Sequence, residues 1–151
     1  MNIFSLKYFG IFFLIISFFS FFNIIYSYYF NLLENLNNYI FTFTINLIIG
    51  LFLTLFKKYK YEKINLFDRI QTVLIGYIIL PAAISIPYYF NMENIGFINC
   101  YFEAISGFTS TGFTIFNDLD KLDQTLILWR SGSQWIGGLY FLFSILLLID
   151  I

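Results

Sequence analysis

The residues with the clearest chemical pattern form one short stretch of the chain. An amphipathic run, Phe97–Phe108, precedes a turn of small and hydroxyl-bearing residues at positions 109–114. Gly112 in this turn tolerates positive φ and lets backbone carbonyls approach an axis closely. Carbonyl oxygens presented in this way replace the water shell of a potassium ion, and the carboxyl end of the preceding helix directs its negative dipole toward the turn. The pattern therefore indicates a cation-binding turn at Ser110, Thr111 and Gly112.

Plainer explanations stay open for the same stretch. An ordinary external loop accounts for residues 109–114 equally well. We expect Glu103 to cap or brace the short helix rather than to contact an ion. The following acidic loop either raises the local cation concentration or is a solvated turn; it contains Asp118, Asp120, Lys121 and Asp123. We expect Arg130 to pair with one of these acids or to extend toward the membrane interface.

Other kinds of site are excluded by what the chain lacks. It has no histidine and one cysteine, which removes Ser-His-Asp and Cys-His catalysis and any histidine-containing metal site. We expect that cysteine, Cys100, to be a small buried apolar residue. A net charge of −1 and no basic stripe argue against a nucleic-acid partner. The sequence therefore predicts no enzymatic activity and no cofactor.

The elements that position the turn are apolar helices. The chain of 151 residues is 60% hydrophobic and 11% charged, with a mean hydropathy of +0.80, as in integral membrane proteins. Since a span needs about 20 apolar residues, we expect spans at 8–30, 39–56, 70–90 and 126–151. The first is too long for the apolar core of a signal peptide. Phe97–Phe108 is too short to span, which favours a re-entrant or interfacial helix.

Charges and special residues refine this arrangement. The basic cluster between the second and third spans contains Lys57, Lys58, Lys60, Lys63 and Arg69. Such clusters mark cytoplasmic loops, so we expect a cytoplasmic amino terminus; a patch that binds nucleic acid or lipid is the alternative. The third span contains Pro81 and Pro87, which neighbouring helices must compensate. Small residues between 131 and 138 predict close helix approach. We expect the polar residues at 31–38 to form a solvated turn.

Residues 102–114 read FEAISGFTSTGFT, followed by LD at 119–120, LWR at 128–130 and QWIGG at 134–138. This combination resembles the first pore loop of the Trk/Ktr/HKT potassium-transporter superfamily, with the strongest likeness to its TrkH branch of bacterial Trk membrane subunits. The resemblance covers residues 65–142 well. The first two spans correspond only in hydropathy to an additional helix pair that TrkH proteins carry.

The resemblance implies a pore of four helix–loop–helix repeats around a pseudo-fourfold axis in the bacterial cytoplasmic (inner) membrane. It implies that one filter wall consists of Ser110, Thr111, Gly112 and Phe113, acting mainly through backbone carbonyls, with potassium bound at Ser110 and Thr111. The family often has threonine at the position of Ser110. Phe97–Phe108 would be the pore helix. A cytosolic nucleotide-binding ring subunit is the implied regulatory partner.

We therefore predict an all-α integral membrane protein. Residues 1–64 would form a leading transmembrane helix pair with a cytoplasmic loop, and residues 65–151 one helix–re-entrant pore loop–helix repeat of a potassium-channel-like fold. Because one wall cannot enclose an ion, we expect an amino-terminal fragment of a longer potassium-uptake protein; assembly of four identical copies and an inactive remnant are alternatives. A small non-transporting membrane subunit, which associates through residues 132–138, is the alternative function.

Overall fold

The described part of the chain is helical almost throughout. The computed structural model describes residues 3–55, 65–92, 95–116 and 122–149, and within them it contains no strand. The five helices are α1 (Ile3–Tyr29), α2 (Leu36–Leu55), α3 (Leu66–Asn91), α4 (Phe97–Phe108) and α5 (Gln124–Leu148). All except α4 are long and apolar enough to cross a membrane. The predicted all-α membrane fold is confirmed, and α4 has the bounds expected of the short helix.

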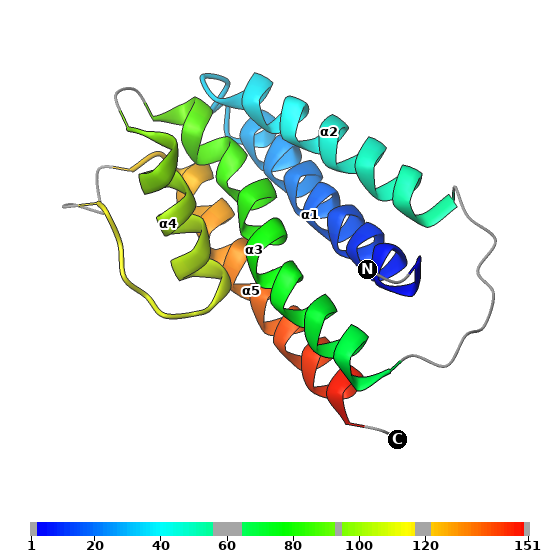
Figure 1. Ribbon diagram of the computed structural model, residues 1–151. Helices are drawn as coiled ribbons and strands as arrows, with labels where there is room; N and C mark the ends of the chain where they lie inside the picture. The colour runs from blue at the N-terminus through cyan, green and yellow to red at the C-terminus, as the bar shows by residue number, and fades with distance from the viewer. Residues whose placement is uncertain (1–2, 56–64, 93–94, 117–121, 150–151) are drawn as a thin grey trace.

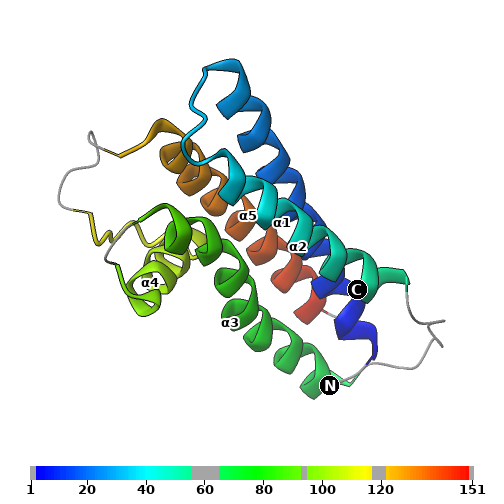
Figure 2. The same ribbon diagram turned by 90° about the horizontal axis from the view of Figure 1, so that it is seen from above.

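The long helices run in alternating directions and pack side by side (Figures 1 and 2). We call the end of the bundle where α1 and α3 end and α2 and α5 begin the loop end. The short helix α4 runs back into the bundle from this end, packed against α3 and α5. Residues 109–116, the returning segment, then lead back toward the loop end (Figure 1). This is the path of a re-entrant loop between two spans.

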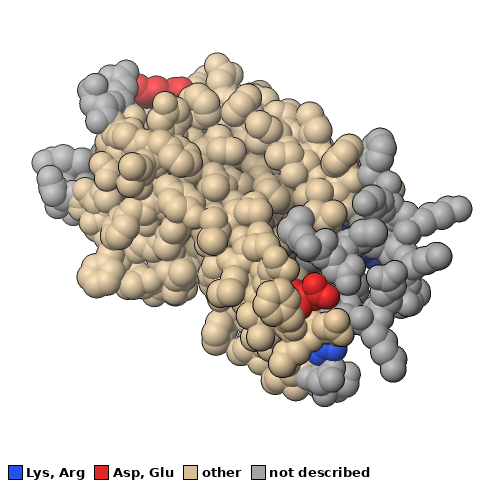
Figure 3. Space-filling model, in the orientation of Figure 1, with Lys and Arg blue, Asp and Glu red and all other residues tan. Residues whose placement is uncertain are grey.

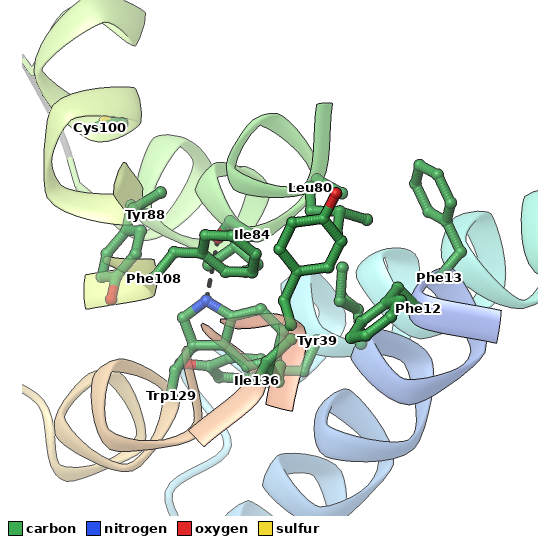
Figure 4. Close-up of a cluster of buried hydrophobic side chains, with 14 of the residues drawn as sticks. Phe12, Phe13, Tyr39, Leu80, Ile84, Tyr88, Cys100, Phe108, Trp129 and Ile136 are labelled. Atoms are coloured by element: carbon green, nitrogen blue, oxygen red, sulfur yellow. Dashed lines mark hydrogen bonds between the residues drawn. The ribbon is translucent and has the colours of Figure 1, made fainter. Parts of the chain in front are cut away.

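Aromatic residues from all five helices form the core. Figure 4 shows Tyr39, Phe108 and Trp129 close together, with the Trp129 indole donating to the Ile84 carbonyl at 3.0 Å. The ring of Tyr140 packs against Tyr77 and Phe12. Trp129 and Tyr140 are thus packing residues, whereas Trp135 is 67% exposed on the outside of α5.

The surface carries few charges in its central part. The coloured Lys, Arg, Asp and Glu atoms that are visible in Figure 3 lie near the two ends of the bundle. Between them the visible face is uncharged, as expected for helices surrounded by hydrocarbon. Three polar side chains in the middle of α2 bind their own helix: Thr42, Asn46 and Thr54 each donate to the carbonyl four residues earlier. Their donor groups therefore need no partner outside the helix.

Helix α3 continues through Pro81 and Pro87. A proline leaves the carbonyl four residues earlier without its helical donor and crowds that turn. In both cases a neighbouring side chain donates to the carbonyl three residues before the proline: Tyr101 to Ile78 at 2.9 Å and Trp129 to Ile84 at 3.0 Å. Neighbouring helices therefore bind α3 beside each proline, at the carbonyl next to the one that the proline frees.

Some predictions fall outside the described residues. These are the basic cluster at Lys57, Lys58, Lys60 and Lys63, and the acidic loop residues Asp118, Asp120 and Lys121.

Candidate functional site

The candidate site begins where α4 ends. The Ser110 amide donates to the Gly107 carbonyl at 3.0 Å, and the Thr111 amide donates to the Ser106 carbonyl at 3.0 Å. These two bonds, with Ser110 at φ 55°, form a Schellman motif, in which a left-handed residue ends the helix. Glycine usually occupies this position, so Ser110 holds a conformation that costs a side-chain-bearing residue about 1–2 kcal/mol. The motif satisfies the last α4 carbonyls and turns the chain back.

The returning segment then presents backbone oxygens to the outside. Ser110, Thr111 and Gly112 are exposed, and among the described residues no hydrogen bond reaches their carbonyls. Gly112 has φ 84°, and a Cβ at this glycine would have no atom within 4 Å. The backbone angle, and not lack of space, is therefore what favours glycine here. The result is a run of three consecutive carbonyl oxygens that are available to coordinate a cation.

Phe113 differs from these three residues. Its carbonyl accepts a hydrogen bond from the Ser106 hydroxyl at 2.5 Å, while its side chain is 68% exposed. Of the four residues predicted for the filter wall, the structure therefore leaves the carbonyls of Ser110, Thr111 and Gly112 without a described partner and uses that of Phe113 to attach the segment to α4.

A buried carboxylate holds the remainder of the segment. Glu103 of α4 has no exposed surface. Its Oε2 accepts from the Thr114 hydroxyl at 3.0 Å and from the Ile115 amide at 3.0 Å. Its Oε1 accepts from Nε of Arg130 at 2.6 Å. One side chain thus connects α4, the returning segment and α5, which confirms the expected bracing role of Glu103, although it braces the loop and does not cap the helix.

The ion pair between Glu103 and Arg130 also compensates the buried negative charge. A lone carboxylate in this position would carry a large desolvation penalty. Arg130, with 16% of its side chain exposed, supplies the opposite charge, and two further donors complete the carboxylate's hydrogen bonding. The two side-chain charges compensate each other, so the pair adds no net charge behind residues 110–112. Carbonyl dipoles such as those of these residues favour a cation where they converge.

Arg130 pairs with Glu103, an acid that the sequence analysis did not offer as its partner; Asp118 and Asp120 lie outside the described residues. Asp123, the one acid of the loop among the described residues, caps α5 by accepting from the Thr125 amide at 3.1 Å. Arg130 lies almost two turns further along α5, on the face that meets α4, where Glu103 is the acid within reach. Helix packing, and not distance along the sequence, selects this pair.

Small residues allow α4 to lie close to α5. A Cβ at Gly137 would fall 1.7 Å from the Phe108 carbonyl oxygen, and one at Gly107 would fall 2.4 Å from the Ser133 hydroxyl. Gly132 similarly faces Phe19 of α1, whereas Gly138 has no atom within 4 Å of its Cβ position. The close helix approach predicted from the small residues of α5 is confirmed, and most of that face is used within the chain.

The sequence analysis did not predict that Ser106 and Thr114 attach the returning segment to α4. Ser106 follows Glu103 by three positions, so both lie on the same face of α4. That spacing was the available signal, because two polar residues on one face of a short apolar helix need partners. Cys100 is fully buried in the core, as predicted.

No cluster of acidic, histidine or cysteine side chains that could hold a metal ion occurs among residues 3–55, 65–92, 95–116 and 122–149. The exposed residues of the returning segment offer backbone carbonyls and hydroxyl groups instead, and carbonyl oxygens are the ligands that potassium filters use.

Comparison with known proteins identifies relatives for most of the chain. The family model TrkH, described as a cation transport protein, matches residues 34–151. An uncharacterized cation transporter of Methanocaldococcus jannaschii is 28% identical over 102 residues, which cover 64% of this chain and 22% of the relative.

Two bacterial relatives carry more specific names. The Trk system potassium uptake protein TrkH of Vibrio parahaemolyticus is 30% identical over 84 residues, 55% of this chain and 17% of the relative. The Trk system potassium uptake protein TrkG of Escherichia coli is 32% identical over 73 residues, 48% of this chain and 15% of the relative. The matched part of this chain thus spans between 15% and 22% of these relatives' lengths. No solved structure matches the chain.

Proposed function

Because the chain belongs to the TrkH family of cation transport proteins, we propose that it takes part in potassium uptake and supplies one wall of a selectivity filter. The family match agrees with the resemblance read from residues 102–114 and 134–138. The wall is formed by Ser110, Thr111, Gly112 and Phe113, with potassium held mainly by backbone carbonyls at Ser110 and Thr111. Potassium is the transported substrate in this proposal and not a resident cofactor.

One observation carries the proposal: the exposed, unshared carbonyls of residues 110–112 are followed at once by a segment that is firmly held. Glu103 and Ser106 together bind the backbone or side chains of Phe113, Thr114 and Ile115. A filter needs oxygens that are free to replace water and yet fixed in position. An ordinary surface turn has no need of a buried, charge-compensated carboxylate behind it.

The returning segment forms one side of an ion path, and the remaining sides come from further repeats or identical copies. The relatives' greater length favours further repeats. The basic cluster between α2 and α3 favours a cytoplasmic amino terminus, which would direct the loop end outward in a bacterial cytoplasmic membrane. A cytosolic nucleotide-binding ring subunit completes the proposed assembly.

The structure weakens the alternative hypothesis of a small non-transporting subunit. That hypothesis used residues 132–138 of α5 as a docking face for a partner. Gly132 and Gly137 instead receive Phe19 and Phe108 of the same chain. Gly138, beside the exposed Trp135, is what remains of the face.

The decisive experiment replaces Gly112 by alanine in the transporter that contains this chain. Since the added Cβ meets no neighbour within this chain, the substitution acts here through the strained backbone angle, at a cost of about 1–2 kcal/mol. We expect rubidium uptake into potassium-depleted cells to fall by about 5- to 30-fold. Gly138→Ala, which also meets open space but lies in a helix, is the matched control and should leave uptake unchanged. Equal uptake by the two variants would refute the proposed filter.

A further inference from the structure

The first turn of α2 reaches across to two other helices at the loop end. Asn35, just before α2, donates to Oδ2 of Asp123 at 2.5 Å. The Tyr39 hydroxyl donates to Oγ1 of Thr125 at 3.2 Å. Asn38 donates to the side-chain oxygen of Asn91 at the end of α3. The prediction of a solvated turn therefore holds for the exposed Asn37 but is wrong for Asn35 and Asn38, which bind helix ends.

The contact with α5 is made at the helix cap itself. Asp123 accepts from the Thr125 amide at 3.1 Å and from the Thr125 hydroxyl at 2.6 Å. Asn35 binds the same carboxylate, and Tyr39 binds the same hydroxyl. Four side chains from two distant parts of the chain thus share one hydrogen-bond network. A cap held in this way fixes both the position and the rotation of the helix it begins.

The network is shielded from water where it meets the core. Tyr39 and Thr125 have no exposed surface, and the Tyr39 ring lies 6.0 Å from the Trp129 ring, centroid to centroid. Buried hydrogen bonds of this kind cannot be replaced by water when they break. The attachment of α2 to the start of α5 is therefore stronger than a similar contact on an exposed surface.

The position of the start of α5 also affects the returning segment, through Arg130. Arg130 follows Thr125 by five residues, about 7.5 Å along the helix axis. Rotation of α5 by one residue position, about 100°, would point Arg130 away from Glu103. The ion pair at 2.6 Å therefore depends on the rotational setting of α5, and the same carboxylate holds Ile115 of the returning segment. Trp129 and Tyr140 attach α5 to α3 on another side, and the α2 contacts complete the support at the loop end.

We propose that Asn35 and Tyr39 form a clamp by which the leading helix pair sets the position of the cation-binding loop, through the cap of α5 and the Arg130–Glu103 pair. Asn38 supports the clamp by attaching the same turn to the end of α3. These are positioning residues, since none of them contacts the returning segment in the described structure. The clamp gives the leading helix pair a role in ion selectivity, and that part of the inference rests on the proposed function.

The first test uses the transporter that contains this chain, in lipid nanodiscs, and measures hydrogen–deuterium exchange at the Ile115 amide, which Glu103 holds. Asn35→Asp places two carboxylates together, and we expect exchange at Ile115 to become about three- to tenfold faster. The double variant Asn35→Asp/Asp123→Asn exchanges donor and acceptor and keeps a good helix cap, so it should restore slow exchange. Asn37→Asp, on the exposed side of the same turn, is the matched control and should have no effect.

A milder variant guards against misfolding. Tyr39→Phe removes one hydroxyl and keeps the buried ring, and it should speed Ile115 exchange about two- to fivefold. If exchange at Thr125 rises in these variants while that at Ile115 stays unchanged, the cap has been released without moving the loop and the clamp is refuted. Failure of the double variant to restore slow exchange would refute it as well.

The second test measures the ratio of rubidium to sodium uptake by the transporter that contains this chain. A lower amount of folded protein reduces both fluxes equally, whereas a displaced loop changes their ratio. We expect Asn35→Asp to lower the ratio at least threefold, and the double variant to restore it. If Ile115 exchange responds as expected but neither Asn35→Asp nor Gly112→Ala alters uptake, the clamp stands and the proposed filter function fails. If Gly112→Ala alters uptake but Asn35→Asp changes neither exchange nor ratio, the clamp alone fails.

Discussion

Two helices of this protein end in the same backbone motif and lead to very different structures. At the end of α1, Asn31 has φ 56°, its amide donates to the Tyr28 carbonyl, and the Leu32 amide donates to the Ser27 carbonyl. At the end of α4, Ser110 has φ 55° with the equivalent pair of bonds. Both are Schellman motifs with a residue other than glycine in the left-handed position.

The difference lies in what holds the chain after the turn. After Asn31 the chain enters α2 within a few residues, and it is side chains, those of Asn35 and Asn38, that reach other helices. After Ser110 the backbone stays outside any helix and is itself held by side chains, those of Ser106 and Glu103. The first turn connects helices, whereas the second displays backbone oxygens.

This comparison shows that local backbone geometry is a poor guide to function. Ending a helix requires the same two hydrogen bonds wherever it happens. The functional difference comes from the groups behind the turn, above all from a fully buried carboxylate with a cationic partner on another helix. Two substitution pairs compare the two turns directly, and a third pair in α5 tests the surface on which the second turn rests.

The largest difference in stability is expected between Glu103, near the second turn, and Glu34, near the first. Glu103→Gln leaves Arg130 without its counterion and should lower the free energy of unfolding by about 2–3 kcal/mol, less than for a fully buried charge because Arg130 keeps some contact with water. Glu34→Gln, at the exposed end of the other turn, should change it by less than about 0.5 kcal/mol. Thermal unfolding of the chain in detergent measures both.

A double-mutant cycle with Arg130→Gln identifies the cause. If the pair acts as proposed, the double variant should lose less stability than the two single variants added together. Additive losses would mean that Glu103 stabilises the turn without Arg130.

A smaller effect is expected where the second turn rests on α5. Gly137→Ala brings a methyl group 1.7 Å from the Phe108 carbonyl oxygen, a backbone atom that can move only with the end of α4. We expect a loss of about 1–3 kcal/mol in unfolding free energy. The neighbouring Gly138→Ala meets open space and should be neutral or slightly stabilising. Similar melting temperatures for the two variants would show that α4 does not depend on this close approach.

The smallest effect is expected at the two left-handed residues themselves. Ser110→Gly relieves the strain of a left-handed serine and should raise the unfolding free energy by about 0.5–1 kcal/mol, after the entropy of the more flexible unfolded chain is subtracted. Asn31→Gly should change it little, because asparagine tolerates this conformation better. Chemical unfolding of both variants provides the measurement, and a larger gain at Asn31 would reverse the ranking of strain.

Much of this architecture follows from local sequence. The sequence predicts the four spans, the short helix α4 and a positive φ at Gly112. Each of these features depends on the residues of one segment alone. The family followed from a local pattern as well, since its motif letters lie within residues 102–138.

The partners of the polar side chains were decided by tertiary structure. Glu103 and Arg130 are 27 positions apart, and Asn35 and Asp123 are 88 apart. Several acids were nearer to Arg130 in the sequence, and nothing local distinguishes Asn35 from the exposed Asn37. Which of them finds a partner depends on how the helices rotate against one another, and that rotation is set by close contacts such as Gly137 against Phe108 and Trp129 against Ile84. The sequence by itself therefore determines the spans and the turn, and only the packing of the helices determines what holds the turn in place.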